Sequence, residues 1–145
     1  METRQNRATY NRPEGDRVLD GNLVRMNIPD SIRQLKSEAA WQNGDRNGVT
    51  LLHNSELRLV LTALKQNAEV IPYTLEGASY IQVLEGRVWV ETSAQSLSLD
   101  AGDALALAGG VPRSFFAEEE AVILLTLTSK GNEDYDVDFN RQSTF

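Results

Sequence analysis

The chain has 145 residues, of which 41% are hydrophobic and 24% are charged, as expected of one soluble globular domain. Its net charge of −7 would repel nucleic acid and anionic membranes, and no apolar run reaches the roughly 18 residues of a membrane span. There is no cysteine, and the first residues lack the apolar stretch of a secretion signal. We therefore expect a cytoplasmic protein with neither nucleic acid nor a membrane as its partner.

The N-terminal part of the sequence predicts an arm, a strand and a helix. Residues 1–22 are polar and nearly free of large apolar groups, so a poorly ordered arm is predicted. Residues 23–28 alternate weakly between apolar and polar and predict a short strand at a sheet edge. A short helix is then predicted over residues 29–41, with the capping-box spacing of Ser31 and Gln34 at its start.

From Val49 onward the pattern is that of β-structure. Short alternating apolar runs are separated by turn residues at intervals of about 8 to 12 residues, which indicates a sandwich, jelly roll or small barrel. The turn at Glu85, Gly86 and Arg87 predicts a hairpin between two of these runs. Residues 131–145 are predicted to form an acidic tail. The predicted strands are 49–53, 57–64, 70–73, 80–84, 88–92, 97–99, 104–108, 114–116 and 122–128.

Three segments resemble the two conserved blocks of the cupins: LEGRV at 84–88, LDAGDAL at 99–105 and GVP at 110–112. The resemblance covers roughly residues 57–128. It implies an all-β, RmlC-like double-stranded β-helix, a jelly-roll barrel of two antiparallel sheets preceded by the short helix. One such domain over residues 23–130 is expected between the arm and the tail.

The cupin resemblance also implies dimers, which such small barrels form by pairing or packing their sheets. The predicted strands at 57–64 and 122–128 carry more apolar surface than the interior of one barrel can use. Exposed strand edges also invite pairing with a second chain. We therefore expect a homodimer.

When the sequence pattern of the family is carried over to this chain position by position, its four usual metal-ligand positions hold Tyr73, Leu75, Ser79 and Arg113. A divalent transition ion needs lone pairs from neutral nitrogen or carboxylate oxygen. Leucine supplies none, and a permanently charged arginine repels the ion. We therefore expect no metal and no cofactor. Metal-dependent dioxygenase, oxalate-degrading and phosphomannose-isomerase-like activities are not expected either.

Other residues that could carry chemistry have a simpler interpretation. His53 is the single histidine and precedes the cupin blocks, so a satisfied or surface position is predicted. The acidic run 118–120 is predicted to be a solvated loop tip. Asp100 and Asp103 flank a glycine, as aspartates that bond their own backbone in a turn do. For Trp89, packing in a core or an interface is predicted.

Arg113 is the position of greatest interest. Strand alternation places it on the same side as Phe115, and the family pattern makes that side the interior. A buried guanidinium needs partners, because an unpaired buried charge is very costly. Glu69 or Glu76 would give a structural pair, and a bound carboxylate or phosphate would give a ligand site. The candidate ligand-binding residues are Tyr73, Ser79, Arg113 and Phe115.

The predicted function is therefore that of a metal-free cupin that binds a small organic ligand, with an anion as one candidate, as a sensor or accessory module. One alternative is a metal-independent enzyme of isomerase or lyase type that uses Tyr73, Asp103 or Arg113 in the barrel pocket. Another is a purely structural dimeric module whose barrel is filled by side chains. An open pocket lined by Tyr73, Ser79 and Arg113 would favour ligand binding, and a filled barrel would favour the structural module.

Overall fold

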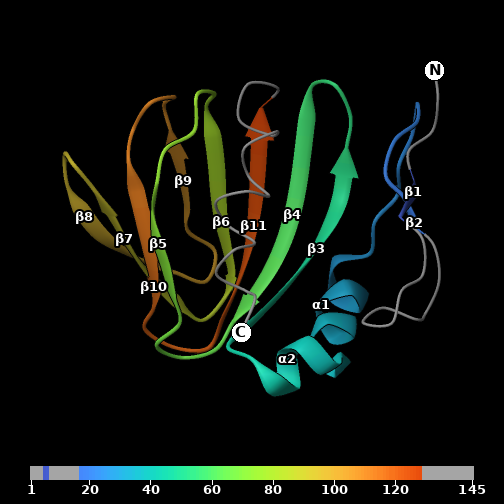
Figure 1. Cartoon of the computed structure of the whole chain (residues 1–145), viewed down its shortest axis with the longest axis horizontal. Coiled ribbons are helices and arrows are strands. Elements are labelled where there is room, and N and C mark those ends of the chain that lie inside the picture. Colours follow the sequence, from blue (N-terminus) through green and yellow to red (C-terminus); the bar gives the residue numbers. More distant parts are fainter. Residues whose placement is uncertain (1–4, 7–16, 129–145) are drawn as a thin grey trace.

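The computed structural model describes residues 5–6 and 17–128 of the chain (Figure 1). The acidic tail predicted for 131–145 and most of the arm predicted for 1–22 lie outside the described residues. The elements are β1 (Gln5–Asn6), β2 (Arg17–Val18), α1 (Ile28–Ser37), α2 (Ala39–Asn43), β3 (Arg46–His53), β4 (Leu57–Leu64), β5 (Glu69–Tyr73), β6 (Ser79–Glu85), β7 (Arg87–Thr92), β8 (Ser96–Asp100), β9 (Ala104–Leu107), β10 (Arg113–Ala117) and β11 (Ala121–Thr128).

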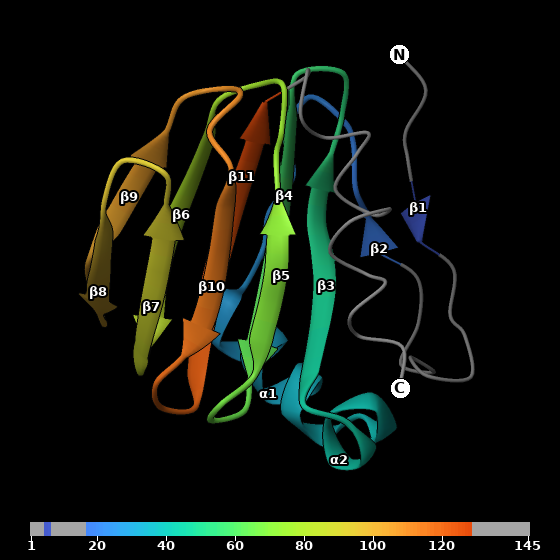
Figure 2. The ribbon, with the colours of Figure 1, turned by 60° about the vertical axis from the view of Figure 1, so that its left-hand side comes forward.

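Two antiparallel sheets face each other and form the barrel (Figures 1 and 2). The larger sheet has the strand order β3-β4-β11-β6-β9, and the smaller sheet has the order β5-β10-β7-β8. The predicted jelly roll is therefore confirmed, and each predicted strand from 49–53 onward is present within a few residues of its expected bounds. None of the helices in the described part of the chain is long and apolar enough to cross a membrane.

The strand predicted at 23–28 is wrong. No strand includes residues 23–27; Leu23 is 92% exposed, and Asn27 serves instead to begin α1. The side chain of Asn27 accepts a hydrogen bond from the backbone N–H of Asp30 over 3.0 Å. Asn27 is thus the cap of the helix, in place of the predicted Ser31.

The helix predicted over 29–41 is divided at Glu38, whose backbone is extended between α1 and α2. Glu38 is buried, and its carboxylate accepts a hydrogen bond of 2.9 Å from the side-chain amide of Asn47 in β3. The same amide donates to the backbone oxygen of Leu35 over 2.9 Å. This link to the sheet holds the break in place, and Trp41 lies in α2 beyond it.

The larger sheet has an apolar core on each of its faces. Its inner face packs against the smaller sheet, with Val60 of β4 and Ile123 of β11 buried in the barrel. Its outer face packs under the helices, where Leu35 of α1 contacts a cluster that contains Leu61 and Val122. The surplus apolar surface that favoured a dimer is therefore covered by the chain's own helices. The homodimer stays a prediction.

The hairpin predicted around Gly86 is also wrong. β6 pairs with β11 and β9 in the larger sheet, whereas β7 pairs with β10 and β8 in the smaller one. The chain crosses between the sheets at Gly86, which has a φ of +80°. A Cβ at this position would lie 2.1 Å from the backbone oxygen of Glu120. Glycine is required here because the crossover backbone passes directly against the turn before β11.

Candidate functional site

Arg113 begins β10 and points between the two sheets. Its side chain is only 2% exposed, and the alternating residues Phe115 and Ala117 are buried on the same side of the strand. In the register of the smaller sheet, Arg113 lies opposite Tyr73 of β5 and Thr92 of β7. The prediction that Arg113 faces the interior is therefore correct.

Backbone oxygens surround the buried guanidinium. Its Nε and Nη2 atoms donate to the backbone oxygen of Val111 over 3.0 and 2.9 Å, and Nη2 also donates to the backbone oxygen of Ala108 over 3.3 Å. Its Nη1 atom donates to the hydroxyl of Ser79 in β6. Carbonyl and hydroxyl oxygens stabilise the cation by their dipoles, so these contacts offset part of the cost of its burial.

The loop that supplies these carbonyls lies at one end of the barrel. We call residues 74–78 and 108–112 the mouth loops; Figure 2 shows the two connections, β5 to β6 and β9 to β10, at the same end of the barrel. The backbone N–H of Gly110 donates to the backbone oxygen of Leu75 over 2.7 Å. A Cβ on Gly109 would lie 1.9 Å from the backbone oxygen of Glu76, so the two loops touch. A ligand that entered between these two loops would have to separate them.

The structure brings together two of the four predicted ligand-binding residues, Ser79 and Arg113, through a direct hydrogen bond. Phe115 is buried in the barrel core. Tyr73 is opposite Arg113 in the backbone register, and its side chain lies outside the described part of the structure.

The structural pair predicted between Arg113 and a nearby glutamate is wrong. Both candidate glutamates, Glu69 and Glu76, have exposed side chains, whereas the guanidinium is buried among backbone oxygens. Glu69 lies on the outward side of β5, because its neighbour Val70 is the residue that enters the barrel core. Among the described partners of the guanidinium are carbonyl oxygens of a mouth loop.

The residues at the four metal-ligand positions do not fit a divalent metal. Leu75 is completely buried and has no lone pair to offer, and Arg113 places a fixed positive charge where the ion would lie. Ser79 already accepts a hydrogen bond from that charge. Elsewhere in residues 5–6 and 17–128, no three His, Cys, Asp or Glu side chains come together in a way that could hold a metal ion.

The turn and histidine predictions can be compared with the structure directly. Asp103 accepts a hydrogen bond from the backbone N–H of Asp100 over 2.9 Å, as the turn interpretation requires. His53 ends the edge strand β3, and its backbone N–H donates to the backbone oxygen of Leu19 over 2.9 Å. His53 therefore lies on an edge of the larger sheet, whereas Arg113 belongs to the smaller one.

The acidic run 118–120 forms the loop between β10 and β11, and its exposed glutamates form ion pairs. Glu119 forms an ion pair with Arg87, and Glu120 forms one with Lys36 of α1 over 3.1 Å. Lys36 also pairs with Glu85 over 3.1 Å. Burial lowers the pKa of Lys36, but its hydrogen bonds to the two carboxylates raise it by more, so the net pKa lies above its ordinary value. These contacts tie α1 to the crossover between the sheets.

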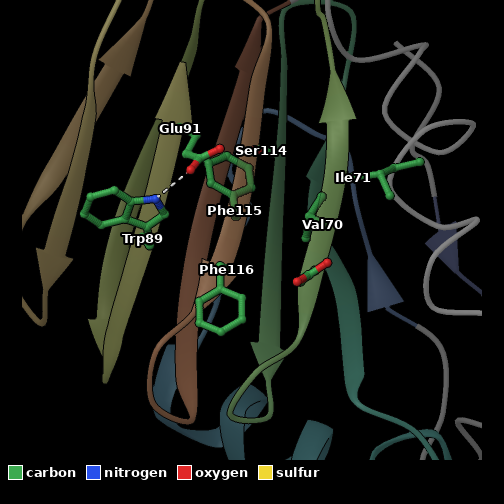
Figure 3. A pocket seen from close by; sticks show the side chains of 8 residues that line it. Val70, Ile71, Trp89, Glu91, Ser114, Phe115 and Phe116 are labelled. Carbon is green, nitrogen blue, oxygen red and sulfur yellow. Dashed lines mark hydrogen bonds between the residues drawn. The ribbon is translucent and has the colours of Figure 1, made fainter. Parts of the chain in front are cut away.

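Sequence reasoning missed a groove on the outward face of the smaller sheet (Figure 3). We call it the outer groove. Its volume is about 300 Å³, and it is lined by Glu69, Val70, Ile71, Trp89, Glu91, Ser114, Phe115 and Phe116. Trp89 lies on this partly exposed face, because its neighbours Val88 and Val90 enter the barrel core. Strand alternation in β7 could have placed Trp89 there, but a sequence does not show which strands are neighbours.

A second hollow, of about 470 Å³, lies beside the segment that leads into α1 and is lined in part by Leu23, Met26 and Leu51. These two hollows lie outside the barrel. Between the sheets lies a continuous cluster of buried apolar side chains from both of them. Apolar side chains of both sheets thus occupy the described part of the barrel interior.

No known family model matches the sequence, and no curated protein matches it. Solved structures do match. An RmlC-like cupin from Shewanella frigidimarina has a TM-score of 0.59 at 22% identity, over 64% of this chain and 83% of that one. KdgF from a Halomonas species has a TM-score of 0.57 at 19% identity, over 61% and 84%. Salicylate 1,2-dioxygenase from Pseudoaminobacter salicylatoxidans has a TM-score of 0.64 at 16% identity, over 86% of this chain and 36% of that enzyme.

These similarities define the class of structure. The two facing antiparallel sheets are a jelly roll of the double-stranded β-helix type. In particular, the chain has the cupin fold. Because function resides in a site and not in a fold, the activities of these neighbours do not transfer with the fold.

Proposed function

We propose that this protein is a metal-free, non-catalytic accessory module of cupin fold, in which the barrel interior serves as a structural core. The observation that carries the proposal is the guanidinium of Arg113, which is buried and hydrogen-bonded to Val111, Ala108 and Ser79. The residue that would anchor an anionic ligand is thereby engaged in holding a mouth loop against the sheet. Of the functions predicted from the sequence, the filled-barrel module agrees best with this geometry.

The energetic cost of a barrel ligand supports the same choice. An anion at Arg113 would have to replace the carbonyl oxygens of Val111 and Ala108, which would then need new donors. It would also have to part the mouth loops, where Gly110 is bonded to Leu75. Dioxygenase or decarboxylase chemistry is not proposed, because Leu75 and Arg113 do not fit a metal. A cytoplasmic location and a homodimer are part of the proposal as the sequence predicted them.

A thermal-shift screen tests the proposal. Benzoate and glucose 6-phosphate are added to the wild-type protein, to Arg113→Leu and to the milder variant Ser79→Ala. We expect neither anion to raise the melting temperature of any of them. A barrel ligand at about 100 times its dissociation constant would add about 2.7 kcal/mol, a shift on the order of 5 °C. A shift of that size in the wild type that is lost in both variants would instead establish a ligand site at Tyr73, Ser79, Arg113 and Phe115.

A further inference from the structure

Two aromatic side chains and two carboxylates share the outer groove. In the strand register, Phe116 of β10 lies between Trp89 of β7 and Glu69 of β5. Glu91 lies two residues further along β7 on the same face, and its carboxylate accepts a hydrogen bond of 3.1 Å from the indole N–H of Trp89 (Figure 3). The groove therefore presents aromatic surface that is bordered by Glu69 on β5 and by Glu91 on β7.

The chemistry of this lining favours one sign of charge. The faces of tryptophan and phenylalanine attract cations within about 6 Å of the ring. Carboxylates accept charge-assisted hydrogen bonds, and they hold planar guanidinium or amidinium groups through two parallel bonds. None of the eight described residues that line the groove is lysine or arginine. The chain as a whole carries a net charge of −7, so its long-range field also attracts cations.

The hydrogen bond from Trp89 to Glu91 adds order to this arrangement. It uses part of the acceptor capacity of Glu91 and leaves the rest to a ligand, because a carboxylate has about four lone-pair sites. It also fixes the indole ring beside the carboxylate, so that a bound cation would meet both at once. Glu69 and Glu91 are exposed on the groove rim, so a ligand can reach both side chains from solvent.

We propose that the outer groove binds a small organic cation that carries a planar amidinium or guanidinium group on an apolar body. The charged group lies between Glu69 and Glu91, and the apolar body packs on Trp89 and Phe116. The volume of about 300 Å³ is at the lower end of small-molecule sites, which suits a ligand of this size. This site is separate from the barrel, so it does not depend on the role of Arg113.

Calorimetric titration with benzamidine tests the proposal, and the isosteric neutral amide benzamide is the matched ligand. The full-length wild type should bind benzamidine at one site at least about tenfold more tightly than benzamide, and the indole N–H resonance of Trp89 should shift. Trp89→Phe assigns that resonance, since the chain has only two tryptophans.

Glu69→Gln and Glu91→Gln together should weaken benzamidine binding about tenfold and leave benzamide unaffected. Glutamine at position 91 still accepts the bond from Trp89, so folding is preserved. Glu56→Gln, which removes an exposed charge outside the groove, is the control and should change little. The proposal is overturned if benzamidine does not bind at concentrations on the order of 10 mM, if benzamide binds equally well, or if Glu56→Gln weakens binding as much as the groove variants.

Discussion

The guanidinium of Arg113 donates a hydrogen bond to the hydroxyl of Ser79, so two residues at the family's metal-ligand positions hold each other. This bond joins β10 of the smaller sheet to β6 of the larger one. A buried arginine has thereby become a cross-link between the sheets and the mouth loop that contains Val111. Its contribution to stability can be measured.

We expect Arg113→Leu to lower the free energy of unfolding by about 2–4 kcal/mol, because the oxygens of Val111, Ala108 and Ser79 lose their donor. Ser79→Ala should cost less. Urea denaturation of both single variants and the double variant gives their coupling energy, expected at about 1–3 kcal/mol. If Arg113→Leu is as stable as the wild type, the guanidinium is a tolerated charge and not a cross-link.

Protein purified without an affinity tag should contain no stoichiometric transition metal. The reason is the donor set, in which Leu75 has no lone pair and Arg113 is positively charged. Inductively coupled plasma mass spectrometry provides the measurement. Zinc, iron, manganese or nickel at one ion per chain would show that the ligand positions have been assigned wrongly.

Gly86→Ala should destabilise the protein far more than Gly102→Ala. Both glycines have positive φ, of +80° and +96°, so both substitutions carry the left-handed penalty of roughly 1–2 kcal/mol. At Gly102 a Cβ meets nothing within 4 Å, whereas at Gly86 it would lie 2.1 Å from the backbone oxygen of Glu120. Chemical denaturation of the two variants isolates the cost of that clash. Equal losses of stability would contradict the crossover geometry.

Leu35→Ala should cost about 2–5 kcal/mol of unfolding free energy, because Leu35 is fully buried between α1 and the larger sheet. Leu23→Ala is the matched control, since Leu23 is 92% exposed and should change stability by less than about 0.5 kcal/mol. Thermal and urea unfolding of both variants check the prediction. A small effect of Leu35→Ala would mean that the helices do not cover the sheet in solution.

The ion pairs of Lys36 should give the stability a dependence on alkaline pH. Because the pKa of Lys36 is raised in the folded state, its contribution is present below the unfolded pKa of about 10.4 and is lost as pH rises through the folded pKa. With both glutamates about half exposed, the contribution should not exceed about 1 kcal/mol. Urea unfolding of the wild type and Lys36→Met should differ at pH 8 and converge above the folded pKa. A constant difference would point to packing alone.

Local patterns predicted most of the strands, because alternation and turn residues are properties of short segments. The run 57–64 matches β4 at both ends, for example. The prediction of a hairpin at Gly86 failed because adjacency in sequence does not say whether two strands share a sheet. The backbone of Gly86 packs instead against Glu120, which is 34 positions away. The prediction of one continuous helix failed for the same reason, since the break at Glu38 depends on a hydrogen bond with Asn47 in β3.

The site was predictable to a smaller extent. The inward position of Arg113 followed from alternation and the family pattern, but its partners did not, because backbone oxygens carry no signature in a sequence. The outer groove could not be predicted, because it needs the neighbouring order β5-β10-β7. Trp89, Phe116 and Glu69 share it only through that order.

The two apolar cores on opposite faces of the larger sheet have a consequence for the dynamics of the protein. β4 and β11 contribute buried residues to both cores, with Leu61 and Val122 on one side and Val60 and Ile123 on the other. Opening their amides to solvent requires the helices and the barrel to separate from them together. Their hydrogen exchange should therefore be the slowest in the molecule and should report the global free energy of unfolding. The backbone amides of the edge strands β8 and β9 should exchange much faster than those of β4 and β11, through local opening.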